Sequence, residues 1–103
     1  MTHYDIDRLS AGAELDSLVA KACGMEQHHA VTFGWPWCPS KDWNDAMLAA
    51  EKSELFDGRF LGRHSKEWIV FDDGPLDEFK AIGSAPTGPL AIARAIAKLG
   101  VKP

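Results

Sequence analysis

The stretch Thr87-Gly-Pro-Leu-Ala-Ile-Ala-Arg-Ala-Ile-Ala-Lys-Leu-Gly100 carries the clearest secondary-structure signal in the chain. Thr87 can cap a helix that Pro89 fits in its first turn, and Gly100 can end it. Within the helix only Arg94 and Lys98 are polar, and as i,i+4 neighbours they mark one narrow hydrophilic stripe. We therefore predict an apolar helix over residues 87–99, which either lies wholly inside the fold or packs against a second subunit to form a homo-oligomer.

Working towards the N-terminus, two more helices are predicted. The first starts after Gly12, and Gly24 can supply the left-handed residue that ends it. Its apolar residues recur at helical spacing: Leu15, Leu18, Val19, Ala22 and Cys23. The second starts with Ser40 as N-cap and runs to about Glu54. We expect its buried stripe to be Trp43, Ala46, Met47 and Ala50.

Three strands complete the expected fold. Ala30–Trp35 reads as a strand because it holds β-branched and aromatic residues. Arg59–Gly62 and Glu67–Phe71 read as an antiparallel hairpin joined by a turn at residues 64–66. Residues 76–85 read as a loop. The order α-β-α-β-β-α favours a small α/β (α+β) domain over residues 12–101, a layered α-β-α sandwich with a three-stranded, largely antiparallel sheet. Residues 1–11 are expected to be a flexible segment.

Composition narrows the classes of partner. The 103 residues carry a formal net charge of −4, so no basic stripe for DNA or RNA is expected. An acidic face could still meet a basic protein groove. No apolar run approaches the length of a membrane span or a signal peptide, which predicts a soluble protein. The two cysteines and the adjacent His28-His29 form no metal-ligand pattern, so neither a metal nor a cofactor is expected.

Three of the four tryptophans fall within Trp35-Pro-Trp-Cys-Pro-Ser-Lys-Asp-Trp43. Tryptophan is enriched at recognition hot spots, so this turn is the first candidate contact site. Trp43 is expected in the core, and Trp68 is expected to pack inward from its strand. The predicted binding residues are then Trp35, Trp37 and Lys41 in the turn, together with Asp42 and Asp45 on the exposed face of the following helix.

Two other uses of this region stay open. Residues 31–39 are similar to the strand-to-helix active site of thioredoxins, and a cysteine before a helix N-terminus tends to have a lowered pKa. The position of the second, resolving cysteine holds Lys41, however, and the remaining elements come in the wrong order. A redox role would rest on Cys38 alone. Alternatively, the helix N-termini at Ser40 and Thr87 could bind the phosphates of a nucleotide.

Three segments, in order, resemble the phage ABA-sandwich domain family: residues 14–25, residues 39–46 and residues 88–100. The resemblance implies a bacteriophage or prophage origin and a layered fold, and it brings no established activity or catalytic residues. We therefore expect a small accessory protein that is not an enzyme. It would act in the host cytoplasm by stoichiometric binding, as a counter-defence inhibitor of a host immune protein such as a CRISPR effector. The alternatives are a sponge for a nucleotide immune signal and a thiol-redox protein.

Overall fold

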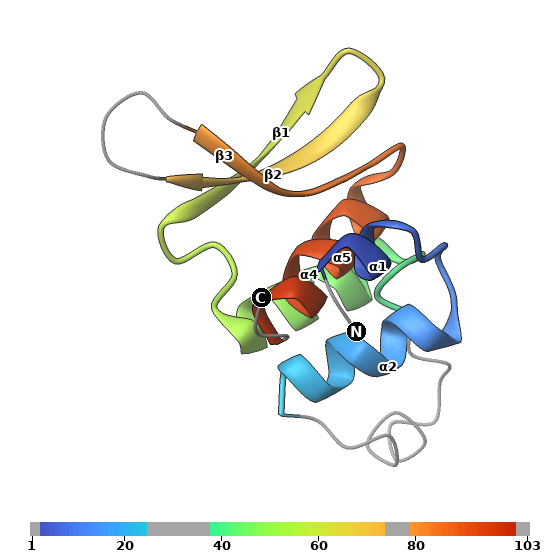
Figure 1. Ribbon diagram of the computed structural model, residues 1–103. Coiled ribbons are helices and arrows are strands. Elements are labelled where there is room, and N and C mark those ends of the chain that lie inside the picture. The colour runs from blue at the N-terminus through green and yellow to red at the C-terminus, as the bar shows by residue number, and fades with distance from the viewer. Residues whose placement is uncertain (1–2, 25–37, 74–78, 101–103) are drawn as a thin grey trace.

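Helix α5 (Gly88–Gly100) is the middle layer of the fold in the part of the chain described by the computed structural model, residues 3–24, 38–73 and 79–100. A sheet packs on one side of α5, and the other helices pack around its remaining sides (Figure 1). These elements are α1 (His3–Asp7), α2 (Ala13–Ala22), α4 (Trp43–Ser53), β1 (Arg59–His64), β2 (Glu67–Asp73) and β3 (Phe79–Ala85).

The predicted α+β class and the three-stranded antiparallel sheet are confirmed. The strands run in the order β1-β2-β3, so β2 is central. β3 was not predicted: the expectation of a loop over residues 76–85 is wrong from residue 79 onward. Its small residues have little intrinsic preference for strands. The strand expected at Ala30–Trp35 lies outside the described residues.

A glycine explains why β3 can form against α5. A Cβ atom on Gly83 would lie 2.6 Å from the carbonyl oxygen of Ala91 and 2.8 Å from the amide nitrogen of Ala95. The absence of a side chain therefore allows the backbone of β3 to lie directly on the backbone of α5. Tertiary packing, which local sequence does not encode, selects this strand.

The two polar side chains of α5 contact neighbouring segments of the fold, as its apolar side chains do. Arg94 is half-buried, and its guanidinium donates to the carbonyl oxygens of Leu9 (2.8 Å) and Ser84 (2.9 Å). Lys98 forms an ion pair with Asp7. The residues of the expected hydrophilic stripe thus form hydrogen bonds and an ion pair with neighbouring segments. Most of α5 is buried within the chain, which agrees with the first of the two predicted arrangements, a helix inside the fold; Leu99 near its end is exposed.

The N-terminal segment is packed against this arrangement. Ile6 on α1 is fully buried, and the carbonyl of Leu9 accepts the hydrogen bonds from Arg94. The prediction that residues 1–11 form a flexible segment therefore has to be corrected for the part from α1 onward. Because most residues of this segment are polar, little in the sequence indicates that one isoleucine is buried and that one backbone carbonyl accepts hydrogen bonds from α5.

The structure of helix α2 agrees with its prediction. In α4, the face that is buried differs from the predicted one. Leu15 and Val19 of α2 are fully buried, and Gly24 has the expected left-handed conformation (φ 72°). On α4 the residues buried in the core are Ala46, Ala49 and Ala50. Trp43 and Met47 are 44% and 46% exposed, so the prediction that both lie in the core is wrong.

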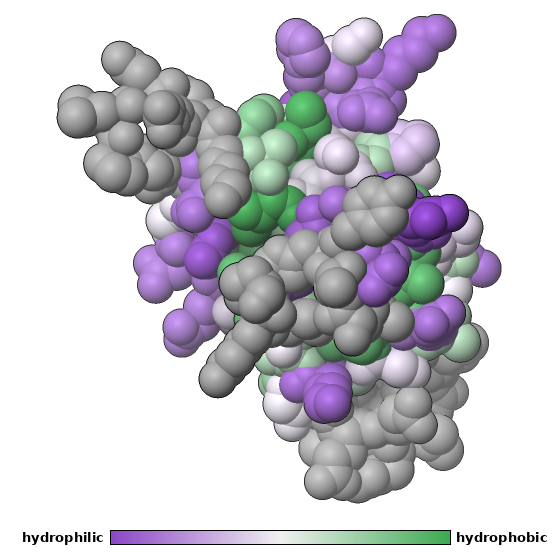
Figure 2. Space-filling model, viewed as in Figure 1, coloured by the Kyte–Doolittle hydropathy of each residue, from purple (hydrophilic) through white to green (hydrophobic). Residues whose placement is uncertain are grey.

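The hairpin of β1 and β2 matches its prediction, with Ser65 and Lys66 in the turn. Phe60 of β1 stacks on Phe71 of β2, with ring centroids 5.1 Å apart. In the view of Figure 2 the hairpin end is hydrophilic, and hydrophobic residues lie beside it over the strands. Among the described residues, no helix is long and apolar enough to cross a membrane.

Candidate functional site

A buried carboxylate on α2 fixes the turn that precedes α4. The amide of Ser40 donates to Asp16 Oδ1 (2.9 Å), and the amide of Gly12 donates to Ser40 Oγ (3.0 Å). Asp16 is 7% exposed and Ser40 is 1% exposed. Burial raises the pKa of Asp16, and the hydrogen bonds from Ser40 offset part of that rise. Ser40 is therefore a bridge to α2 and is not the predicted N-cap of α4.

The two aspartates predicted to contact a partner serve the start of α4. Asp42 is the N-cap residue, and its Oδ2 accepts the amide of Asp45 at 3.0 Å. Asp45 is only 8% exposed, and its Oδ2 accepts the amide of Cys38 at 2.9 Å. Asp45 therefore holds the turn in place, and Asp42 is the exposed one of the pair.

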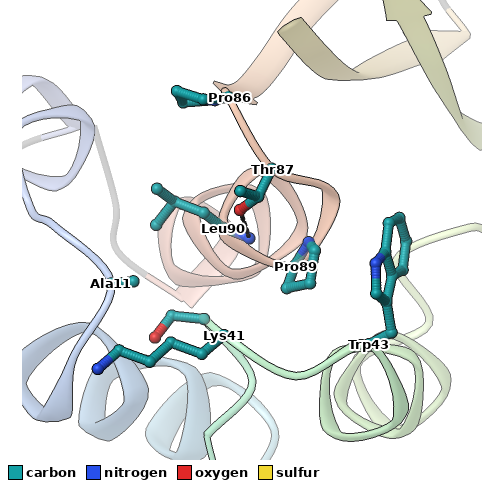
Figure 3. A pocket seen from close by; sticks show the side chains of 8 residues that line it. Ala11, Lys41, Trp43, Pro86, Thr87, Pro89 and Leu90 are labelled. Atoms are coloured by element: carbon teal, nitrogen blue, oxygen red, sulfur yellow. Dashed lines mark hydrogen bonds between the residues drawn. The ribbon is translucent and has the colours of Figure 1, made fainter.

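The turn and the N-terminus of α5 together line a pocket of about 380 Å³, shown in Figure 3. We call it the Trp43 pocket. Trp43 and Lys41 extend from the same turn to opposite sides of it, while residues preceding and opening α5 form the wall between them. The lining residues are Ala11, Ser40, Lys41, Trp43, Pro86, Thr87, Pro89 and Leu90.

The indole of Trp43 is held between α5 and the sheet. A Cβ atom on Gly88 would lie 1.9 Å from Trp43 Cη2, so the ring edge rests directly on the first residue of α5. On the sheet side, Trp43 meets Trp68 edge-to-face, with centroids 5.3 Å apart and ring planes at 77°. Arg63 then covers Trp68, with its guanidinium carbon 5.5 Å from the ring centroid. The exposed indole is therefore fixed in position by packing.

The Trp43 pocket offers a ligand several hydrogen-bond donors. Within the described residues, Lys41 Nζ forms no ion pair and Trp43 Nε1 donates no hydrogen bond. Thr87 Oγ1 accepts the amide of Leu90 (3.4 Å), which leaves its hydroxyl proton available. Ser40 Oγ is already engaged by Gly12. The pocket therefore suits an apolar group that carries hydrogen-bond acceptors.

Cys38 lies in a setting that disfavours the thiolate. Burial raises the pKa of its thiol, and the nearby carboxylates of Asp16, Asp45 and Asp42 raise it further, against the opposing effect of Lys41. A thioredoxin-like cysteine would have the opposite shift. The acidic residues that organise the turn thus offset what the N-terminus of α4 would contribute.

The two helix N-termini proposed for phosphate binding carry their own partners. At α5, Pro89 has no N–H group, and the amides of Leu90 and Ala91 donate to Thr87. At α4, Asp42 is the N-cap and Asp45 lies in the first turn, and both place negative charge at this end. The missing N–H of Pro89 at α5 and the negative charge at α4 both disfavour a phosphate group at these ends.

The structure brings together part of the predicted site and adds residues from a distant segment. Lys41 lines the pocket, whereas Trp35, Trp37 and His28-His29 lie outside the described residues. Within the described ranges, no group of His, Cys, Asp and Glu could hold a metal ion. Sequence reasoning missed the pairing of Trp43 with Pro86–Leu90; the capped helix start at Thr87 was visible, but nothing local placed it beside this turn.

No known protein family model matches this chain, and neither do any curated proteins or solved structures.

Proposed function

We propose that this protein acts by stoichiometric binding to another protein, with the Trp43 pocket as its principal contact. The resemblance of its three segments to the phage ABA-sandwich family suggests the setting. In that setting the protein would come from a phage or prophage and act in the host cytoplasm, where it would block a host defence protein such as a CRISPR effector.

The observation that carries the proposal is the exposure of Trp43 in a fixed position. It is 44% exposed although Gly88 and Trp68 hold its ring. A large side chain that is already immobilised loses little conformational freedom on binding, so most of its buried area contributes to affinity. Met47, one turn further along α4, extends the exposed apolar surface.

The test is a selection from a library of displayed bacterial protein fragments, with the wild-type protein as bait. Selected fragments are then titrated calorimetrically against wild type, Trp43→Ala and Leu99→Ala. Leu99 is a matched control because it is also 44% exposed but lies about 16 Å along α5 from Gly88, the residue that Trp43 contacts, at 1.5 Å per residue.

We expect one-to-one complexes that lose tenfold or more in affinity with Trp43→Ala and less than twofold with Leu99→Ala. A hot-spot tryptophan typically accounts for about 2 kcal/mol or more, which exceeds a tenfold change. Binders that ignore Trp43→Ala would refute the proposed contact. Cys38→Ser should leave binding unchanged. A loss of binding in this variant would instead favour a role for the Cys38 thiol.

A further inference from the structure

We infer that the Trp43 pocket takes a short acidic–apolar peptide segment of its partner: one bulky apolar side chain with a carboxylate beside it. This inference rests on the proposed function and names the chemistry of the ligand. It follows from the lining of the pocket, the free donors at its rim and the charges around Lys41.

The apolar part of the ligand follows from the walls. Trp43, Pro86, Pro89 and Leu90 line the pocket, and in the view of Figure 3 Pro89 lies between the indole and Leu90. At about 380 Å³ the pocket is near the lower end of the range for ligand sites, so it suits one anchoring side chain with its flanking backbone. Such a side chain would bury its surface against the indole.

The acceptor part follows from the unused donors. Lys41 Nζ, the indole N–H of Trp43 and the Thr87 hydroxyl can all donate, and the ammonium group and the indole N–H can only donate. A peptide supplies acceptors on both counts: a backbone carbonyl for a neutral donor, and a side-chain carboxylate for the ammonium group. A basic ligand would place its own hydrogen-bond donors against the donors of the pocket.

The surrounding charges favour a carboxylate over a phosphate. Among the described residues, Lys41 is the only cation that lines the pocket. The carboxylates of Asp16, Asp42 and Asp45 all act on nearby Cys38, so they stand close to the same turn. One ammonium group is enough to pair with a singly charged carboxylate, whereas a dianionic phosphate is usually held by several cations or N–H donors.

The experiment uses an array of heptapeptides with leucine at the central position, in which each other position is, in turn, glutamate, glutamine or lysine. Binding of the fluorescently labelled full chain is measured for the wild type, and the best peptides are titrated by fluorescence polarisation. An exposed ion pair contributes up to about 1 kcal/mol, which corresponds to about fivefold in affinity. We therefore expect glutamate at one position to bind about three- to fivefold more tightly than glutamine, and lysine to bind more weakly still.

Matched variants assign the preference to its residues. Lys41→Ala should abolish the glutamate preference, whereas Lys52→Ala, which removes the same charge from the last turn of α4, should preserve it. Trp43→Phe keeps a ring and removes the indole N–H, so it should weaken all peptides by a similar factor. Thermal unfolding of each variant confirms that it is folded.

Several results would overturn the inference. These are no binding of any array peptide at 100 μM, equal binding of glutamate and lysine peptides, and a glutamate preference that survives Lys41→Ala. Displacement of the peptide by adenosine monophosphate at a lower concentration than the free peptide would assign the pocket to a nucleotide. If displayed protein fragments still depend on Trp43 while the glutamate preference is absent, the proposed function stands and only the acidic ligand is rejected.

Discussion

Replacing Gly88 with alanine should dislodge the indole that lines the pocket. The new Cβ would lie 1.9 Å from Trp43 Cη2 and 2.3 Å from Cζ2. Carbon atoms in good contact are about 3.5–4.0 Å apart, so the ring has to retreat by roughly 1.5–2 Å. Gly88 belongs to a buried helix, which leaves Trp43 as the partner that moves.

The size of the effect can be bounded. Overpacking costs about 1–3 kcal/mol, and losing the edge-to-face contact with Trp68 accounts for about 0.5–1.5 kcal/mol of that range. Alanine is the better helix former by up to about 1 kcal/mol, which offsets part of the loss. We therefore expect Gly88→Ala to lower the free energy of unfolding by about 1–2 kcal/mol.

A double-mutant cycle isolates the contact between these two residues. In a Trp43→Ala background the added methyl group meets no ring, so Gly88→Ala should be neutral or stabilising by up to about 1 kcal/mol. The coupling energy between Gly88→Ala and Trp43→Ala should then be about 1–3 kcal/mol. Urea denaturation followed by far-ultraviolet circular dichroism is the appropriate assay, because tryptophan fluorescence is itself altered by the substitutions.

A coupling energy below about 0.5 kcal/mol would refute the reasoning, since it would mean that Trp43 does not rest on Gly88. Binding offers an independent check. Gly88→Ala should weaken any ligand that depends on Trp43, even though Gly88 itself is buried beneath the ring. Unchanged binding would separate the contact site from this wall of the pocket.

Three further substitutions test other parts of the structure. Gly83→Ala should destabilise the protein by about 3 kcal/mol or more, measured by urea denaturation, because its Cβ would lie 2.6 Å from backbone that cannot move aside; a loss below 1 kcal/mol would contradict the close approach of β3 to α5. Ser65→Gly should stabilise the hairpin by about 0.5–1 kcal/mol, since Ser65 has φ 58°, and a fall in melting temperature would be the opposite result. The pKa of Asp16 is raised above its ordinary value of 3.8 in the fold, so the contribution of Asp16 to stability is most favourable when it is protonated and declines as pH rises through the raised value. Asp16→Asn should remove that decline, so its stability relative to wild type should increase from pH 3 to pH 7 in urea titrations; a constant difference would exclude this linkage.

Elements with strong local periodicity were predictable. The cap at Thr87, the apolar face of α2 and the β1–β2 hairpin follow from spacing and turn chemistry over a few residues. β3 was not predictable, because its strand depends on Gly83 meeting α5. The orientation of Trp43 was not predictable either: Ser40 and Asp42 are both good N-caps, and the distant Asp16 decides between them by engaging Ser40.

For the candidate site, the sequence identified the correct turn but misassigned several of its residues. Lys41 was placed at a contact and does line the pocket. Trp43 was assigned to the core because it shares helical spacing with Ala46, Met47 and Ala50. The face that α4 buries holds Ala46, Ala49 and Ala50 instead, and the indole is exposed. The opposite wall comes from a segment more than forty positions later in the chain, which local patterns cannot bring near.

The buried Asp16 bears on the choice between a structural and a functional role for this turn. A carboxylate with a raised pKa lowers stability at neutral pH compared with a neutral residue of the same shape. What Asp16 provides in return is position: it fixes Ser40, and Ser40 directly precedes Lys41 and lies three residues before Trp43. Buried polar groups of this kind specify one arrangement where apolar packing alone would allow several. A fold that needed only stability would gain from an asparagine at this position, so a charged group held there is better explained by the need to present Lys41 and Trp43 in one geometry. If Asp16→Asn is more stable at pH 7 and also binds partner peptides more weakly, stability and recognition will have been separated at a single residue that does not line the pocket.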